Sequence, residues 1–264
     1  ISKKGAVFFI EDLNSSNGTR VGGELLNYKT GTVKLNLERE HRYYASLGFD
    51  GGIWFGQGKT GLSGLYSVNA HKGGNVSPIP ADHSQNLTGI WPKKVVNYKT
   101  VMSDAASGFT SVTYPFPVIR MADLYLMYAE ALNEKGEDYA TVLPWIDMVR
   151  ERSGLQGVKE SWDQYVGNSK YATQTGLRQI IMQERRIELA FEGHYFWDVR
   201  RWKTATTELT QPLTGWKVRY GETDVDYYSE NLVLVRDFTP KMYFWPIDIG
   251  ELRKDPNLVQ NYGW

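Results

Sequence analysis

The amino-acid sequence predicts a mainly α-helical protein that also carries long irregular loops and short β-strands. From Pro117 onward, apolar residues recur at helical spacing in successive segments. Residues 1–115 are instead rich in Gly, Asn and Tyr, with short β-type runs between turn signals. We therefore expect a loop-rich, β-containing region over residues 1–115 and a helical region over residues 116–264. A chain of 264 residues can hold both in one integrated domain.

The first region contains two β-type runs and a glycine-rich stretch. The runs "AVFFI" and "GTVKLNL" predict short strands. The stretch "GFDGGIWFGQGKTGLSG", from Gly48 to Gly64, shows no regular periodicity and predicts a long irregular loop. Long loops in compact domains are commonly functional or disordered, so this stretch is a place to look for ligand contacts.

The helical region opens with two segments joined by a short link. The segment "VIRMADLYLMYAEALNEKG" is apolar almost all round and predicts a mostly buried helix that ends at Gly136. The segment "TVLPWIDMVRERSGL" predicts a second helix, with Pro144 in its first turn and Gly154 after its end. The short link predicts a helical hairpin.

The remaining segments alternate between helical and extended patterns. A looser stretch, Gln156 to Thr175, precedes a helix through Leu177 that Gly193 breaks, and "HYFWDVRRWKTA" predicts another short helix. Further on, "NLVLVRDF" and "KMYFWPI" predict strands, and "KDPNLVQNYGW" predicts a turn-rich tail.

Composition excludes several functional classes. The 30 basic and 30 acidic residues balance, so no strong positive field favours nucleic acid. The absence of cysteine excludes disulfides, thiolate metal sites and cysteine nucleophiles. The sequence contains no run of about 18 apolar residues, so it predicts no membrane-spanning helix. Aromatic residues are abundant, with 9 Trp and 17 Tyr, and such rings suit either a core or a stacking surface for sugars.

The stretch "ERRIELAFEGHYFWDVRRW" poses the main functional question. Helical projection places Glu184 and Glu188 on an apolar face, where an unpaired carboxylate is costly. The pair can be a glycosidase acid/base pair or part of a buried ion-pair network. We favour the network, because glycosidase carboxylates normally flank a cleft from different elements, whereas these two face a packing core. The candidate partners are Arg120, Arg200 and Arg201, together with Arg150, Arg152, Arg185 and Arg186.

Five segments in order resemble the SusD/RagB family of Bacteroidetes surface lipoproteins, which capture glycans. They are "HRYYASLGFDGGIW", "VIRMADLYLMYAEALNEKG", "IDMVRERSGL", "ERRIELAFEGHYFWDVRRW" and "DPNLVQNYGW". The resemblance covers Leu37 to the last residue. It implies TPR-like helix pairs with irregular loops, and no hydrolytic role for the acidic block. Two positions depart from the family pattern: Tyr262, where the family usually has Pro, and Asp147, where it usually has Asn.

The resemblance also implies a cellular setting. It identifies the chain as the C-terminal part of a larger lipoprotein, held at the outer membrane by a lipid on an N-terminal segment that this chain lacks. The expected partner is a SusC-like TonB-dependent outer-membrane transporter, to which the bound oligosaccharide is delivered. No cofactor is expected.

Aromatic residues in turn-rich settings are the candidate ligand contacts. Trp54, Phe55 and Tyr66 lie in or beside the glycine-rich stretch, and Trp91 and Tyr98 lie in "TGIWPKKVVNYKT". A flat ring on a loop offers an apolar platform for a pyranose face, while neighbouring polar side chains bind hydroxyls. The alternative is that each ring packs its own loop onto the helices.

Metal sites are not predicted from the four histidines. None of them shows a metal-ligand spacing, and His71 and His83 are isolated in loops. Three functions remain: a non-catalytic glycan-binding protein, a glycoside hydrolase that uses the acidic pair, and a helical-repeat module that binds protein or peptide. The first is favoured. The sequence does not name the glycan, and a peptide cargo remains an alternative.

Overall fold

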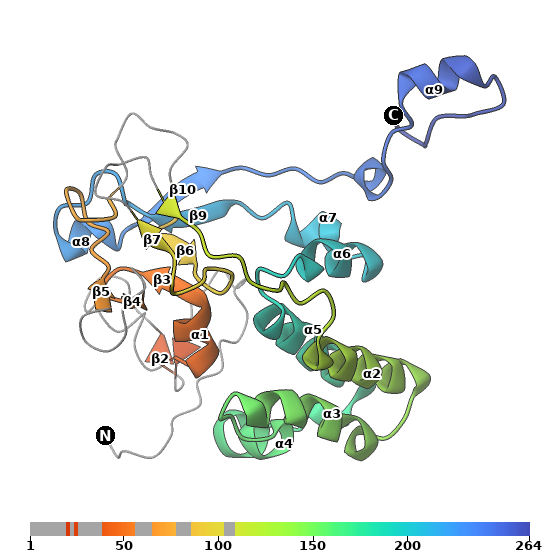
Figure 1. The fold of residues 1–264 in the computed structure, drawn as a ribbon. Coiled ribbons are helices and arrows are strands. Elements are labelled where there is room, and N and C mark those ends of the chain that lie inside the picture. The colour runs from red at the N-terminus through yellow and green to blue at the C-terminus, as the bar shows by residue number, and fades with distance from the viewer. Residues whose placement is uncertain (1–19, 22–23, 26–38, 56–64, 78–85, 103–108) are drawn as a thin grey trace.

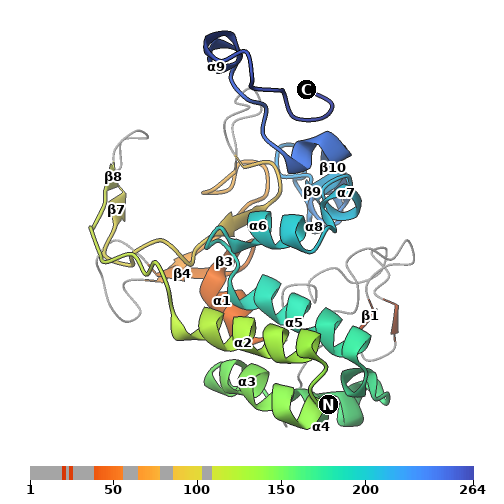
Figure 2. The same cartoon turned by 90° about the vertical axis from the view of Figure 1, so that its right-hand side faces the viewer.

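The computed structural model describes residues 20–21, 24–25, 39–55, 65–77, 86–102 and 109–264 (Figure 1). Helices gather on one side of the molecule and short strands on the other, and the C-terminal segment extends away from both in Figures 1 and 2. The mainly helical fold with few short strands confirms the predicted fold class. The predicted strands "AVFFI" and "GTVKLNL" lie outside the described residues.

Three long helices form the main core. They are α2 (Met121–Lys135), α3 (Tyr139–Arg152) and α5 (Gln174–Glu188). Helices α2 and α3 pack as the predicted hairpin, and α5 packs against both (Figure 2). Apolar side chains recur at helical spacing on their facing sides, so the three helices bury a common stripe. The most buried members of this stripe are Leu126, Ala129, Val142, Ile146, Leu177 and Ile181.

The ends of these helices follow the capping signals of the sequence. Gly136 ends α2 in the left-handed conformation with φ 88°, as predicted. Asp138 accepts a hydrogen bond from the Ala140 amide at 2.8 Å at the start of α3. Gly154, with φ 73°, follows the end of α3. These local signals explain why the hairpin could be located from the sequence.

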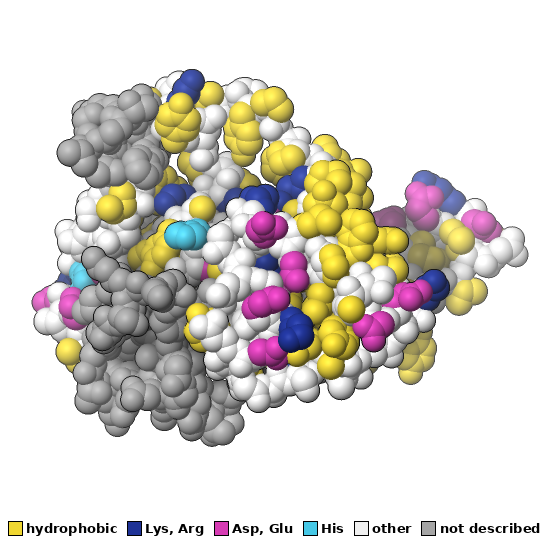
Figure 3. Space-filling model, turned by 90° about the horizontal axis from the view of Figure 1, so that it is seen from below, with side chains coloured by type: hydrophobic (Ala, Val, Ile, Leu, Met, Phe, Trp, Pro, Cys, Tyr) yellow, Lys and Arg dark blue, Asp and Glu magenta, His cyan; other side chains and the backbone are white. Residues whose placement is uncertain are grey.

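Two predictions about the hairpin are wrong. Helix α3 begins at Tyr139, so Pro144 lies beyond its first turn and leaves the carbonyl of Ala140 without its usual helical donor. Helix α2 is not mostly buried, since its outer side exposes Met121 by 56% and Tyr128 by 49%. Figure 3 shows hydrophobic side chains gathered in a broad group on the face seen from below. The helix has apolar side chains on both its buried and its exposed sides, and α3 and α5 cover only one of them.

Short helices connect and follow the core. Between α3 and α5 lie α4 (Val158–Ser161), the π-helix η3 (Trp162–Val166) and the 3-10 helix η4 (Lys170–Ala172). After α5 the chain turns through Phe191 and Gly193, both with positive φ, into α6 (His194–Arg201). Helix α7 (Ala205–Glu208) follows. The predicted break near Gly193 and the short helix after it are confirmed.

The strands of the described residues form two-stranded antiparallel pairs. These pairs are β1 (Arg20–Val21) with β2 (Glu24–Leu25), β3 (Leu47–Phe49) with β6 (Ile90–Pro92), β4 (Ile53–Phe55) with β5 (Leu65–Ser67), β7 (Val101–Met102) with β8 (Phe109–Thr110), and β9 (Leu213–Trp216) with β10 (Glu230–Leu234). Helix α1 (His41–Ser46) precedes β3, and α8 (Asp224–Tyr227) lies between β9 and β10.

Two extended predictions need correction. The stretch from Gly48 to Gly64 is not one irregular loop, because it contains most of β3 and all of β4, while residues 56–64 lie outside the described ranges. The segment "KMYFWPI" is not a strand, since η5 (Pro240–Tyr243) is a 3-10 helix with proline at its start. The predicted strand "NLVLVRDF" is confirmed in its first half by β10. Helix α9 (Ile249–Lys254) lies in the extended C-terminal segment.

Candidate ligand-binding surface and buried ion-pair cluster

Trp54 and Trp91 come from neighbouring strand pairs and converge on Gly48. A Cβ atom placed on Gly48 would lie 2.4 Å from Cζ3 of Trp54 and 3.5 Å from Cβ of Trp91. The Trp54 ring therefore lies directly over the backbone of β3, in space that only glycine leaves free. Both tryptophans are half-buried, so part of each side chain remains accessible to solvent.

Both rings lie on strands and not on an irregular loop. Trp54 lies on β4, and Trp91 lies on β6 and packs against the buried cluster of Ala70, Val218, Tyr227 and Tyr228. This contact agrees with the alternative interpretation, in which the ring packs its own segment onto a helix, since Tyr227 belongs to α8. A half-buried ring held by a rigid element can also offer its open side to a ligand, with little loss of side-chain freedom.

The other three predicted ligand contacts are less well joined to this pair. Phe55 and Tyr66 lie on β4 and β5, where Tyr66 pairs with Trp54 in the backbone register, and their side chains lie outside the described set. Tyr98 is 47% exposed, and the ammonium of Lys99 lies 5.8 Å from the centre of its ring. The structure thus brings Trp54 and Trp91 together at Gly48, whereas Tyr98 lies six residues beyond the end of β6.

Lys93 fixes the base of this aromatic surface. Its ammonium donates to the carbonyl oxygen of Tyr44 at 2.8 Å and to that of Ile53 at 3.0 Å. Burial lowers the pKa of Lys93. One side chain from the end of β6 therefore ties α1 to the start of β4, next to Trp54.

Glu184 and Glu188, the two glutamates of α5, lie in a buried ion-pair cluster. Glu184 and Glu188 are only 3% and 2% exposed. Nη1 of Arg42 lies 2.6 Å from Oε1 of Glu184 and 3.0 Å from Oε2 of Glu188, so one guanidinium bridges both carboxylates. Arg150 binds Glu184 at 3.1 Å. Both buried carboxylates are therefore paired with guanidinium groups, as a buried charge requires.

Glu188 is the more heavily bound of the two. Its Oε1 accepts from Arg120 at 2.6 Å and from Arg152 at 2.7 Å, in addition to the contact with Arg42. Its backbone carbonyl accepts from Nη2 of Arg120 at 2.7 Å and from Nζ of Lys94 at 2.6 Å. Arg120 and Lys94 also bind Glu192, which extends the cluster into the turn after α5.

The electrostatics of Glu188 oppose a role as a general acid. Burial alone would raise the pKa of Glu188, but hydrogen bonds from Arg120 and Arg42 outweigh it and hold the pKa below the ordinary 4.5. A glycosidase acid needs a raised pKa and an open space beside its partner carboxylate for the scissile bond. Here the Arg42 guanidinium occupies the space between the two carboxylates, so the arrangement suits a structural clasp.

Four of the predicted arginine partners bind elsewhere. Two of them are Arg185, which pairs with Asp123 and Asp198, and Arg186, which pairs with Glu208. Arg201 pairs with Glu130 of α2 and with Asp198 at 2.8 Å. The guanidinium of Arg200 lies 3.5 Å from the ring centre of Phe196 and donates to the Phe196 carbonyl at 3.0 Å. The turn between α5 and α6 separates both arginines from the glutamates, so nearness in sequence was misleading. Only Arg120 of the three leading candidates contacts Glu188.

A second buried cluster was not foreseen. Arg185 is 3% exposed and binds Asp123 at 2.9 Å and Asp198 at 3.0 Å, which joins α5 to α2 and α6. Arg42 was likewise missed, although it lies in one of the segments that carried the family resemblance. No local pattern links Arg42 to Glu184, because 142 residues separate them.

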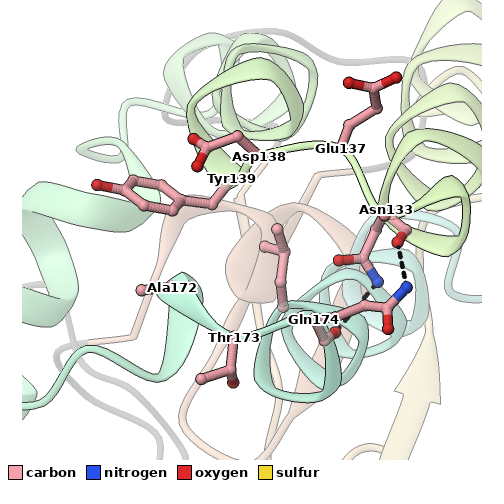
Figure 4. Close-up of a pocket in the computed structure, with 9 residues that line it drawn as sticks. Asn133, Glu137, Asp138, Tyr139, Ala172, Thr173 and Gln174 are labelled. Atoms are coloured by element: carbon pink, nitrogen blue, oxygen red, sulfur yellow. Dashed lines mark hydrogen bonds between the residues drawn. The ribbon is translucent and has the colours of Figure 1, made fainter.

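A small cavity lies away from the tryptophans of the candidate surface. It has a volume of about 270 Å³ and lies where the end of α2 meets the starts of α3 and α5 (Figure 4). Asn133 and Gln174 bridge its wall by reciprocal amide bonds, at 3.1 Å from Asn133 Nδ2 and 2.7 Å from Gln174 Nε2 to the opposing carbonyls. These two hydrogen bonds join the end of α2 to the start of α5. Among the side chains that the structure describes, those of Trp54, Trp91 and Tyr98 do not line the cavity.

Neither metal sites nor membrane spans emerge from the parts of the chain that the structure describes. Within those ranges, no three His, Asp or Glu side chains are grouped in a way that would hold a metal ion. In the same ranges, every helix is too short or too polar to cross a bilayer.

The protein is a helical scaffold, held together by the buried ion-pair cluster around Glu184 and Glu188, with short strands and aromatic residues along one edge. Comparison with known proteins identifies its family. Residues 9–264 match the SusD family model. The chain belongs to the SusD family. This confirms the resemblance seen in the sequence.

Individual relatives agree with this assignment. SusD-like protein P2 of Formosa agariphila is 37% identical over 140 residues, which cover 53% of this chain and 27% of that protein. SusD-like protein P25 of the same organism is 39% identical over 144 residues, which cover 54% and 23%. The chain spans well under half of the length of the relatives it matches.

Solved structures support the fold. A SusD-like protein from Bacteroides fragilis, BF3747, superposes with a TM-score of 0.67 at 28% identity, over 86% of this chain and 39% of that one. The protein BT4246 superposes with a TM-score of 0.72 at 26% identity, over 88% of this chain and 38% of that one. The helical scaffold is thus shared with longer proteins.

Proposed function

We propose that the protein binds an oligosaccharide at the outer surface of the cell without cleaving it, and passes it to a SusC-like TonB-dependent transporter. The observation that carries this proposal is the pair of half-buried tryptophans converging on Gly48, next to strands fixed by Lys93. Membership of the SusD family supports the ligand class and the cell-surface setting. The transporter and the lipid anchor follow from the family resemblance.

The open sides of Trp54 and Trp91 would form the sugar platform. A pyranose ring has an apolar face that stacks on an indole, and its hydroxyls reach polar groups at the edge of the ring. Such a surface needs no net charge, which agrees with the balanced composition of the chain. Phe55, Tyr66 and Tyr98 are proposed as further contacts on the same β-rich side.

The hydrolase alternative is disfavoured by the geometry of the acidic pair. Glu184 and Glu188 share Arg42 and are almost fully buried, so a glycosidic bond has no route between them. The peptide-binding alternative keeps some support, because α2 exposes an apolar side that includes Met121 and Tyr128. An array of defined glycans compared with a peptide library separates the two.

Substitution of the tryptophans tests the proposal. Trp54→Ala and Trp91→Ala should each weaken the binding of a defined oligosaccharide by about 1–3 kcal/mol, the range for loss of one stacked ring. Isothermal titration calorimetry gives the affinities, and circular dichroism confirms the fold of each variant. Trp245→Ala is the matched control, since Trp245 is 66% exposed on the distant C-terminal segment. Wild-type affinity in both test variants would refute the assignment of this surface.

A further inference from the structure

The cavity between the end of α2 and the starts of α3 and α5 is lined by a buried amide, that of Asn133, a residue that is only 1% exposed. Its Nδ2 donates to the carbonyl oxygen of Gln174 at 3.1 Å. Because only the nitrogen of an amide can donate, this bond fixes the orientation of the amide and leaves its oxygen on the other side. Figure 4 shows that oxygen on the side of the space that the lining residues enclose.

The side-chain oxygen of Asn133 has no donor among the residues that the structure describes. The hydrogen bonds of this side chain to those residues are made by its nitrogen alone, to the Gln174 carbonyl and to the carboxylate of Glu134 at 3.3 Å. Buried acceptors in proteins are normally paired, because an unpaired one loses its hydration without replacement. The cavity therefore presents a fixed acceptor to any donor that enters it.

The charges around the cavity favour a positively charged donor. Two of the nine lining residues are acidic, Glu137 and Asp138, and none of the nine is basic. Glu137 is paired with Lys135 at 2.6 Å, whereas the Asp138 carboxylate accepts only from the Ala140 amide among the described residues. A hydrogen bond between a charged donor and a carboxylate is stronger than one between neutral groups. Asp138 is therefore the second group that a cation in this cavity would meet.

The helix starts at the cavity do not make it a site for anions. The first amides of a helix attract negative charge, and both α3 and α5 begin here. Each start is already capped, since Asp138 accepts from the Ala140 amide at 2.8 Å and the Thr173 hydroxyl accepts from the Gly176 amide at 3.1 Å. The end of α2 adds carbonyl oxygens, the negative end of that helix. An anion would meet the Asp138 carboxylate, so a cation is the better fit.

Apolar side chains line the cavity beside these polar groups. Leu177 is buried, and Tyr139 is half-buried against the same core, where its ring meets that of Tyr171 edge-on at 5.5 Å. A volume of about 270 Å³ is below the usual range for drug-sized ligands, about 300–1,000 Å³, so the cavity suits a small group. We propose that it is a second ligand site, which binds a primary ammonium carried on a short carbon skeleton, with the Asn133 oxygen and the Asp138 carboxylate as its acceptors.

Titration with three matched small molecules tests the charge preference of the cavity. Butylammonium chloride, butanol and sodium butyrate share a carbon chain and differ in the charge of the head group. Nuclear magnetic resonance follows the side-chain amide signals of Asn133 and Gln174, which report on the cavity directly. Butylammonium should shift both signals in a saturable way, butanol should bind about fivefold more weakly, and butyrate should not bind. Absence of a saturable shift with butylammonium, or equal affinity for butanol, would overturn the proposal.

Two variants separate the acceptors from the fold. Asp138→Asn removes the charge and keeps an oxygen that can cap α3, so the variant should fold and should bind butylammonium about two- to fivefold more weakly. Asn133→Ala, with its fold checked by circular dichroism, should lose the saturable shift of the Gln174 signal. Asp248→Asn is the matched control, because Asp248 caps α9 in the same way, with the Gly250 amide at 2.7 Å, on the distant C-terminal segment. Equal affinity in wild type, Asp138→Asn and Asp248→Asn would contradict the assignment.

The source of the ammonium is identified by two further pairs of probes. The side chain of Nα-acetyl-lysine amide and the amino group of glucosamine share the proposed chemistry, and acetylation of either nitrogen removes its charge. At least one of the two should bind about fivefold more tightly than its acetylated form, and the one that does so identifies the source. Equal binding of both acetylated forms would refute an ammonium site. Because Trp54 and Trp91 do not line the cavity, such a failure would leave the proposed oligosaccharide surface untouched.

Discussion

Nη1 of Arg42 lies 2.6 Å from Glu184 and 3.0 Å from Glu188, so a single guanidinium from the β-rich region bridges two carboxylates of α5. This contact joins the two regions of the chain across more than 140 residues. It also converts what looks like a catalytic pair into a structural one. The stability of the protein should therefore depend on Arg42 far more than on an ordinary surface arginine.

Removal of Arg42 should be strongly destabilising. Arg42→Ala leaves Glu184 and Glu188 buried with fewer donors, and loss of one partner from a buried pair typically costs about 3–5 kcal/mol. Urea unfolding followed by tryptophan fluorescence measures the change. Lys159→Ala is the control, since Lys159 forms an exposed pair with Asp163 and its removal should change stability little. A loss for Arg42→Ala as small as that of the control would show that the bridge contributes little.

Glu188 should make stability fall in acid. Its folded pKa is lowered below 4.5, so the folded state binds its proton less readily than the unfolded state. The stabilisation is fully present above about pH 4.5 and is lost as the pH falls through the folded pKa. The gap in unfolding free energy between wild type and Glu188→Gln should therefore be widest near neutral pH and narrow in acid. A gap that stays constant over this range would be inconsistent with an ionised, arginine-bound Glu188.

Asp147 offers a stabilising change. It accepts from the Val158 amide at 2.7 Å, and burial raises its pKa, so its ionised form is disfavoured in the folded protein. Asp147→Asn, the residue usual in the family, keeps the acceptor and removes the charge. It should raise the unfolding free energy near neutral pH by about 1 kcal/mol or less, with a smaller gain in acid where Asp147 is protonated. Thermal unfolding at both pH values checks this, and a loss of stability near neutral pH would contradict it.

Gly48 should be required for the position of the Trp54 ring. A Cβ at Gly48 would meet Trp54 Cζ3 at 2.4 Å, so Gly48→Ala must displace the ring, at a cost of about 1–3 kcal/mol. It should also weaken oligosaccharide binding. The double variant with Trp54→Ala is the control, because the clash disappears with the ring and the added cost of Gly48→Ala should fall. Equal costs in the two backgrounds, measured by urea unfolding, would show that the ring does not lie on Gly48.

The parts of the fold that could be predicted from sequence are those set by local signals. Helices α2, α3, α5 and α6 follow apolar periodicity and glycine ends, and β10 follows a β-type run. The strands β3 and β4 were missed because their pairing with β6 and β5 is non-local and their sequence is rich in glycine. The exposed side of α2 was missed because periodicity shows which residues are apolar, and not which of them a neighbour covers.

In the candidate site, too, features set by local sequence could be predicted, and contacts between residues far apart in the chain could not. The burial of Glu184 and Glu188 follows from helical projection, but their main partner Arg42 lies far away in the chain, while the nearer Arg200 and Arg201 bind elsewhere. His71 was taken as isolated because Asp50 and Asp224 flank it only in space. Partners that the chain brings together from a distance leave no local pattern in the sequence.

The central claim is that the protein binds an oligosaccharide and does not cleave it, and one measurement tests this most directly. An oligosaccharide that the chain binds is incubated with wild type and with Glu188→Gln, and newly formed reducing ends are followed over time. We expect none above the protein-free blank with either protein. Release of reducing ends by wild type, abolished in a folded Glu188→Gln variant, would show that the buried pair is catalytic and would contradict the account.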